Sequence, residues 1–198
     1  MNWEDINTAT FLAVNNKHYD FLDPLMLFAS NKLCLIPVFI LCAYFTIKYF
    51  NKQKDTYHPL NHVLLLSVLS ALFLFGFYIL PILFKAYFPM EKPCSNPEIA
   101  SIIRLLGTDC YSDRVHSFFG YRSCLTWCFT VFVLLSVKNA ATPFKILLLV
   151  WCFVVSYSRV YVGSHYPGNV AISNIIGICI GYIGYRVYTY LRSNLFAI

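Results

Sequence analysis

The sequence predicts an all-α integral membrane protein with five or six membrane-spanning helices. Of its 198 residues, 59% are hydrophobic and only 12% are charged, and the mean hydropathy is +0.62. Soluble domains carry about 25% charged residues, so this composition argues against a soluble fold. Several apolar runs approach the roughly 20 residues that a helix needs to cross a bilayer. We therefore expect a single membrane domain, 1–198, embedded in the lipid bilayer.

The expected elements follow the alternation of apolar runs and polar turns. In 7–22, apolar residues are mixed with asparagine, lysine and histidine, which favours a short helix in the membrane interface. The longest polar segment, 85–117, is expected to form the main loop. A sixth span results if 7–29 inserts. The five expected spans are 33–50, 63–84, 118–137, 144–162 and 170–190, with Pro81 kinking the end of the second.

The distribution of charge predicts the orientation of these spans. The segments after the first, third and fifth spans are rich in lysine and arginine and hold one acid, Asp55, whereas the other eight acids lie on the opposite side. By the positive-inside rule the basic side is cytoplasmic, and so is the C-terminus. The N-terminus, the 85–117 loop and 158–169 then share the outer face, which is periplasmic if the membrane is a bacterial inner membrane. The net charge of +6 is not gathered in one soluble patch, so nucleic-acid binding is not expected.

The segment 158–169 carries the residues that most suggest chemistry. It lies between two apolar runs but contains Arg159, His165 and Asn169. Such groups are costly near hydrocarbon unless they face water, a partner or a ligand. A guanidinium can hold phosphate oxygens in a planar fork, and a neutral imidazole can attack or relay a proton. Phosphate chemistry is therefore the first hypothesis for this segment.

These residues carry a family resemblance. The chain resembles the integral-membrane type 2 phosphatidic acid phosphatases, relatives of the vanadium haloperoxidases, whose motifs are K-x6-R-P, P-S-G-H and S-R-x5-H-x3-D. Ser158, Arg159 and His165 stand at the spacing of the third motif. Asn169 stands where the family has its aspartate.

The other two motifs are met with substitutions. Lys85 and Lys92 stand at the spacing of the first, with lysine in place of its arginine. For the second, aligning 119–122 with P-S-G-H puts Arg122 where the family has histidine, directly before an apolar run that would form the next helix. His116 lies six residues earlier and is the alternative, because a loop could still deliver it to the site.

The resemblance implies a phosphatase that acts on a lipid phosphate or isoprenoid diphosphate through a phosphohistidine at His165, with no metal or other cofactor. The phosphate-binding residues would be Lys85, Lys92, Arg159 and Arg122. The family's aspartate orients the nucleophile, and its second histidine protonates the leaving oxygen. Asn169 lacks that negative charge, and Arg122 cannot serve as an acid because an arginine guanidinium keeps its proton in proteins. We expect a phosphatase with impaired turnover, in which His116 is the candidate for a substitute acid. The alternative is a degenerate member that binds, senses or transports a phosphorylated lipid.

The cysteines divide into two groups. Six of the eight lie in or near the expected spans, where a cysteine is most simply a small apolar residue. Cys94 and Cys110 lie in the 85–117 loop, and the resemblance extends to them because some bacterial members carry a similar pair. A disulfide between them requires an oxidising compartment, and the sequence leaves its existence open.

Overall fold

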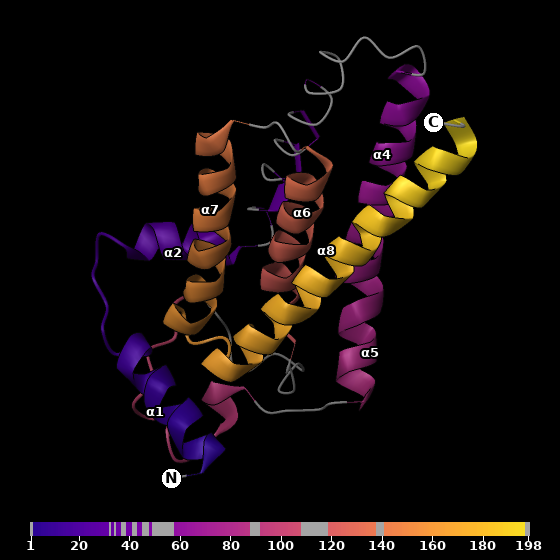
Figure 1. Ribbon diagram of the computed structural model, residues 1–198. Helices are drawn as coiled ribbons and strands as arrows, with labels where there is room; N and C mark the ends of the chain where they lie inside the picture. The colour runs from indigo at the N-terminus through magenta and orange to yellow at the C-terminus, as the bar shows by residue number, and fades with distance from the viewer. Residues whose placement is uncertain are drawn as a thin grey trace.

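The computed structural model is an all-helical bundle, which confirms the predicted fold class (Figure 1). It describes residues 2–31, 33, 35–36, 39–40, 43–44, 48, 58–87, 92–107, 119–137 and 141–196, without the side chains of 58–60, 85 and 196. The described elements are α1 Trp3–Asn15, α2 Asp23–Ser30, α4 His58–Leu74, the π-helix Phe75–Ile79, α5 Leu80–Tyr87, the 3-10 turn Pro93–Ser95, α6 Tyr121–Ser136, α7 Thr142–Tyr161 and α8 Pro167–Phe196.

Three described helical stretches are long and apolar enough to cross a membrane. They are Asn61–Phe84, Thr142–Tyr161 and Pro167–Leu195, whereas α6 is apolar but shorter. Each of these four overlaps a span expected from the sequence. The expected span at 33–50 falls mostly outside the described residues.

The N-terminal segment forms two helices, where the sequence suggested one at 7–22. α1 already begins at Trp3, where the Asn2 amide donates a hydrogen bond to the Asp5 carboxylate at 2.9 Å. It ends at Asn15, whose side chain bonds to backbone groups of distant segments. α2 then starts at Asp23 with proline in its first turn, a position that proline favours.

The irregularity expected at Pro81 lies one turn earlier. The π-helix Phe75–Ile79 joins α4 to α5 directly before the proline. Proline lacks the N–H that would bond to the carbonyl of the preceding turn, and a wider π-helical turn accommodates that loss. Within it, Gly76 meets α6, because a Cβ there would lie 2.5 Å from a Leu125 methyl carbon.

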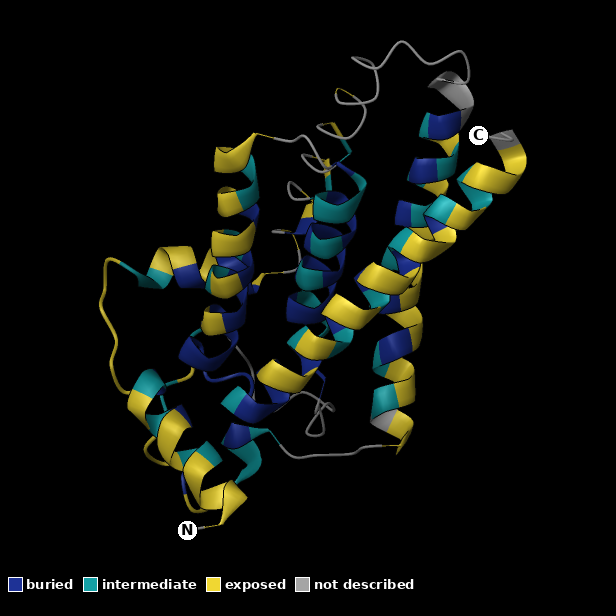
Figure 2. Cartoon of the chain, viewed as in Figure 1, coloured by how far each residue is buried: buried dark blue, intermediate teal, exposed yellow. Residues whose placement is uncertain are grey.

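Helix α6 is the centre of the bundle, and α8 crosses close to it. A Cβ on Gly177 or Gly181 would lie only 2.2 or 2.4 Å from the carbonyl oxygens of Cys124 and Cys128, so only glycine permits this approach. Figure 2 shows buried residues along α6 and exposed residues on the outer faces of α7, α8 and α4. These outer faces carry large apolar side chains, as expected for helices that face lipid.

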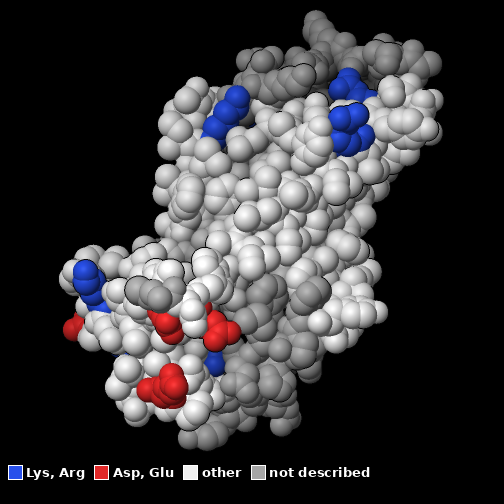
Figure 3. Space-filling model, turned by 60° about the horizontal axis from the view of Figure 1, so that its bottom comes forward, with Lys and Arg blue, Asp and Glu red and all other residues white. Residues whose placement is uncertain are grey.

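The two ends of the bundle differ in structure and charge. Figure 1 shows α1, the turn from α7 to α8, the end of α5 and the start of α6 at one end, with the C-terminus at the other. The described acidic side chains gather at the α1 end beside some lysines and arginines, whereas the charged side chains seen at the opposite end are lysines and arginines (Figure 3). The described part of the 85–117 loop and the segment 158–169 both lie at the α1 end, where each of them is hydrogen-bonded to α1.

Candidate functional site

The segment 158–169 folds tightly around the C-terminus of α7. The backbone amides of Ser164 and His165 both donate to the Arg159 carbonyl, at 3.1 and 3.2 Å. Gly163, directly before these two residues, has φ +81°, the left-handed region that favours glycine, and a Cβ there would lie 2.8 Å from the Arg104 carbonyl oxygen. This turn holds His165 against the last turn of α7, next to the backbone of Arg159.

Three residues of the third motif are buried together at this end of the bundle. Arg159, His165 and Asn169 expose only 5%, 5% and 4% of their surface. Burying a cation and two hydrogen-bonding side chains costs free energy unless partners compensate. One partner of Arg159 is Ser30, the last residue of α2, whose carbonyl accepts a hydrogen bond from Nη1 at 3.2 Å and whose hydroxyl accepts another.

The Ser173 side chain links the start of α6 to the start of α8 through two hydrogen bonds. The Ser173 hydroxyl donates to the Asn169 carbonyl at 2.7 Å and accepts from the Gly120 amide at 2.9 Å. Gly120 is the N-cap of α6, and Asn169 lies in the first turn of α8. The first turn of α6, which contains Arg122, is therefore fixed beside the segment that contains Asn169.

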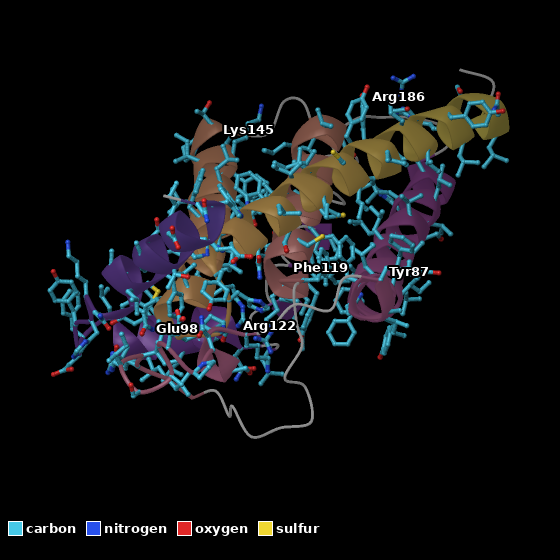
Figure 4. All side chains as sticks on the ribbon, turned by 90° about the horizontal axis from the view of Figure 1, so that it is seen from below. Tyr87, Glu98, Phe119, Arg122, Lys145 and Arg186 are labelled. Atoms are coloured by element: carbon cyan, nitrogen blue, oxygen red, sulfur yellow. The ribbon has the colours of Figure 1, made fainter. Side chains whose placement is uncertain are left out.

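Arg122 is a cation with few compensating contacts among the described residues. Its guanidinium lies 5.2 Å from the centre of the Tyr121 ring, and its Nε is buried with no hydrogen-bond partner in the part of the chain that the structure describes. Figure 4 looks onto this end of the bundle and shows Arg122 among the helix ends. A cation placed in this way can bind an anion but cannot deliver a proton near neutral pH.

The remaining residues of the motifs are described only in part. Lys92 is half-buried at the N-cap of the Pro93–Ser95 turn. Lys85 lies in the last turns of α5, where only its backbone is described, and His116 falls outside the described residues. The structure thus brings Arg159, His165 and Asn169 together with the first turn of α6, and gives no side-chain geometry for Lys85 or His116.

Cys94 is disulfide-bonded. Its expected partner, Cys110, lies outside the described residues, so the pairing stays a prediction. Among the residues that are described, no group of three or more His, Cys, Asp or Glu side chains could hold a metal ion.

Sequence reasoning missed a network that anchors the site. Asn15 accepts a hydrogen bond from the Arg104 amide at 2.8 Å and donates to the carbonyls of Arg104 and Tyr161, at 2.9 and 3.0 Å. The Arg104 guanidinium forms a two-bond ion pair with Asp23, and the Tyr161 hydroxyl donates to the same carboxylate at 2.7 Å. Hydrogen bonds from Arg104 first, and from Tyr161 second, lower the pKa of Asp23 to about 2.

The N-terminal helix contributes two further contacts to the motif segment. The Gly168 amide, in the first turn of α8, donates to the Asn7 side chain at 2.9 Å. The rings of Phe11 and Tyr166 lie 5.4 Å apart. One regularity links these anchors in the sequence: Asn7, Asn15, Asp23 and Ser30 follow one another at intervals of 8, 8 and 7 residues.

Buried polar residues at one end of an apolar helical bundle define an integral membrane protein with a polar site near one membrane face. Residues 28–193 match the PAP2 superfamily, so the chain belongs to that family. The match covers most of the chain, which confirms the resemblance seen in the motifs.

Three known proteins resemble this chain over most of its length. A lipid A 4'-phosphatase of Bacteroides thetaiotaomicron is 26% identical over 194 residues, which are 96% of this chain and 80% of the relative. The crystal structure of Aquifex aeolicus LpxE has a TM-score of 0.64 and 22% identity, covering 94% of this chain and 99% of that one. A transmembrane PAP2-type phosphatidylglycerolphosphate phosphatase from Bacillus subtilis has a TM-score of 0.58 and 15% identity, covering 96% and 86%. The two structures support the fold.

Proposed function

We propose that this protein binds the phosphate group of a membrane lipid at the α1 end of the bundle and hydrolyses it slowly through His165. The observation that carries this proposal is the joint burial of Arg159, His165 and Asn169 at one helix junction. A cation, a nucleophile and a hydrogen-bonding side chain are thereby held on one short, tightly hydrogen-bonded segment. Membership of the PAP2 superfamily gives the same arrangement a chemical role.

The proposed reaction has two steps. The neutral imidazole of His165 attacks phosphorus, the bond from phosphorus to the lipid oxygen breaks, and the departing oxygen takes up a proton. Water then attacks the phosphohistidine and releases inorganic phosphate, which restores the imidazole. Positive charge from Arg159, Lys85 and Lys92 stabilises the phosphoryl oxygens in both steps.

Two substitutions account for the proposed slow turnover. Asn169 offers no negative charge to balance the histidine as it becomes positive during attack. Arg122 cannot protonate the leaving oxygen, and general acid catalysis typically contributes about 10²–10⁴ in rate. His116 is the candidate for a substitute acid.

The proposed substrate is a lipid that carries a phosphate at the membrane surface. The Bacteroides relative acts on lipid A, so a phosphorylated glycolipid of that class is the first to test, and an isoprenoid diphosphate is the second. The exposed apolar side chains on the outer helix faces allow the acyl chains to stay in the bilayer while the headgroup reaches the helix ends. The distribution of charge supports a site on the outer, periplasmic face.

One observation favours a second function, a binding protein that does not turn over. Arg122 adds a positive charge at the second-motif position, and its buried Nε has no hydrogen-bond partner among the described residues. A site with more cations and no proton donor holds phosphate tightly but does not cleave its ester. Such a protein would sense or transport a phosphorylated lipid.

Phosphate release by the purified, detergent-solubilised protein separates these functions. The substrates are lipid A, an isoprenoid diphosphate and phosphatidic acid, and each is tested beside the His165→Ala variant. Release that is lost in His165→Ala and kept in His18→Ala, a change at an exposed histidine, supports the phosphatase. Orthovanadate binding that requires Arg159, without release, supports the binder. If the protein shows neither phosphate release nor vanadate binding, both functions are contradicted.

A further inference from the structure

We infer that Ser30 is a positioning residue for the phosphate site, because it holds the guanidinium of Arg159 in one orientation. This inference rests on the proposed function, which assigns Arg159 to phosphate binding. Ser30 belongs to none of the three family motifs and lies 129 residues away from Arg159 in sequence. It is the last residue of α2 and is 7% exposed.

Ser30 offers two acceptors to the same nitrogen of Arg159. Its backbone carbonyl and its hydroxyl oxygen both accept hydrogen bonds from Nη1. An Nη nitrogen of a guanidinium carries two hydrogens, so Nη1 has enough donors for both acceptors. The planar group is then oriented, which also fixes the direction of the edge formed by Nε and Nη2. That edge provides two parallel donors, which is the geometry that binds phosphate oxygens in pairs.

The end of α2 suits this role electrostatically. The last carbonyls of a helix have no partner within the helix and carry partial negative charge. The Ser30 carbonyl is one of them, and the Arg159 guanidinium satisfies it. Ser30 is a neutral partner, so this contact does not itself neutralise the positive charge of Arg159.

α2 is itself held in place at its start and in its middle. At its start, Asp23 pairs with Arg104 and accepts a hydrogen bond from the Tyr161 hydroxyl. In its middle, Met26 packs against Tyr161 and the adjoining turn. Ser30 is therefore presented to the last turns of α7 by a docked helix. Such preorganisation of the residues behind a binding group is what keeps that group in its productive geometry.

The test compares orthovanadate affinity and the KM for lipid phosphate in full-length wild type and in variants of Ser30. Ser30→Ala removes the hydroxyl and leaves the carbonyl, so we expect affinity to fall about tenfold. Ser30→Thr keeps the hydroxyl and should restore affinity to within about threefold of wild type, since the removed hydrogen bond is present again. A role in stability alone does not predict this rescue of affinity.

A double-mutant cycle with Arg159→Lys links the effect to the guanidinium. A lysine ammonium has no planar fork to orient, so Ser30→Ala should not weaken vanadate binding further in that background. Ser156→Ala is the matched control, because Ser156 is also 7% exposed and hydrogen-bonded but lies in another cluster. It should lower thermal stability without changing vanadate affinity.

The outcomes separate failure of this inference from failure of the proposed function. Wild type that binds vanadate through Arg159, with Ser30→Ala unchanged in affinity, overturns the role of Ser30 alone. Equal losses from Ser30→Ala in the wild-type and Arg159→Lys backgrounds also overturn it. Wild type that neither binds vanadate nor releases phosphate overturns the proposed function, and the role of Ser30 with it.

Discussion

Two buried polar clusters where α6, α7 and α8 meet use their hydrogen bonds differently. The first is a polar seam formed by Ser123, Trp127, Ser156 and Asn174. The Ser156 hydroxyl lies 2.9 Å from that of Ser123, 3.2 Å from the Trp127 nitrogen and 3.2 Å from the Asn174 side-chain oxygen. Asn174 also accepts a hydrogen bond from Ser123. The seam is uncharged, and its members bond to one another.

The second cluster is the candidate site. It contains the cations Arg159 and Arg122, and it holds buried polar atoms, the Arg122 Nε and the Ser164 hydroxyl, that have no hydrogen-bond partner among the described residues. Buried polar groups in proteins are almost always paired, so such exceptions need an explanation. Interhelical hydrogen bonds between neutral groups hold membrane helices together, whereas buried charges mark function. The contrast supports the proposal that the site binds a ligand, whereas the seam serves to hold the bundle together.

The largest expected effect comes from restoring the family's residues at the site. If Arg122 occupies the second-motif position, Arg122→His combined with Asn169→Asp should raise kcat by about 10² or more, because a proton donor and an orienting charge return. The measurement is phosphate release from a lipid phosphate, with His165→Ala added to the double variant as the control. Unchanged kcat in the single and double variants would show that Arg122 is misaligned.

Removing the positive charge of Arg159 should have the next largest effect. Arg159→Gln should weaken orthovanadate binding about 100-fold, since a charge-assisted pair is lost at a buried position. Arg186→Gln is the matched control, because Arg186 is exposed on α8 and bonds to Tyr182 rather than to the site. Binding curves for the two variants should differ clearly. Similar curves would argue that vanadate binds elsewhere.

A substitution in the polar seam should lower the stability of the protein and leave ligand binding unchanged. Ser156→Ala removes the hydroxyl that joins the three helices, and we expect a loss of about 1 kcal/mol in the free energy of unfolding. Thermal unfolding in detergent measures this loss, and Ser67→Ala, an exposed serine on α4, provides the control. A drop in vanadate affinity for Ser156→Ala would remove the distinction between the two clusters.

The smallest expected effect is a loss of stability at acidic pH, and it concerns Asp23, which anchors the start of α2. Because Asp23, which lies outside the membrane-spanning helices, has a pKa of about 2 in the folded protein, the unfolded state binds the proton first as pH falls below about 4. Stability should therefore decline between about pH 4 and pH 2, and this group should add no pH dependence above that range. Asp23→Asn should flatten the decline in thermal unfolding measured across these pH values. An equally steep decline in the variant would mean that other carboxylates cause it.

The sequence predicted the parts of the fold and site that depend on local patterns. Apolar runs indicated helices at α4–α5, α6, α7 and α8, and motif spacing selected Arg159, His165 and Asn169. It did not predict that α1 would end at Asn15, because that side chain bonds to Tyr161, which is 146 residues away. The sequence also contained no sign of the hydrogen bond from Gly120 to Ser173, since no motif connects these two residues.

Composition and motif spacing by themselves determined that the chain is a membrane bundle of the PAP2 superfamily, and they predicted a phosphate-binding segment at 158–169. Hydrophobic burial in lipid depends on the apolar content of each stretch, and so it can be read from the sequence. Only the tertiary structure decided which distant groups support the segment 158–169, such as Ser30 on Arg159 and Asn7 on Gly168. Hydrogen bonds are short and directional, so their partners are known only when the helices are placed in space.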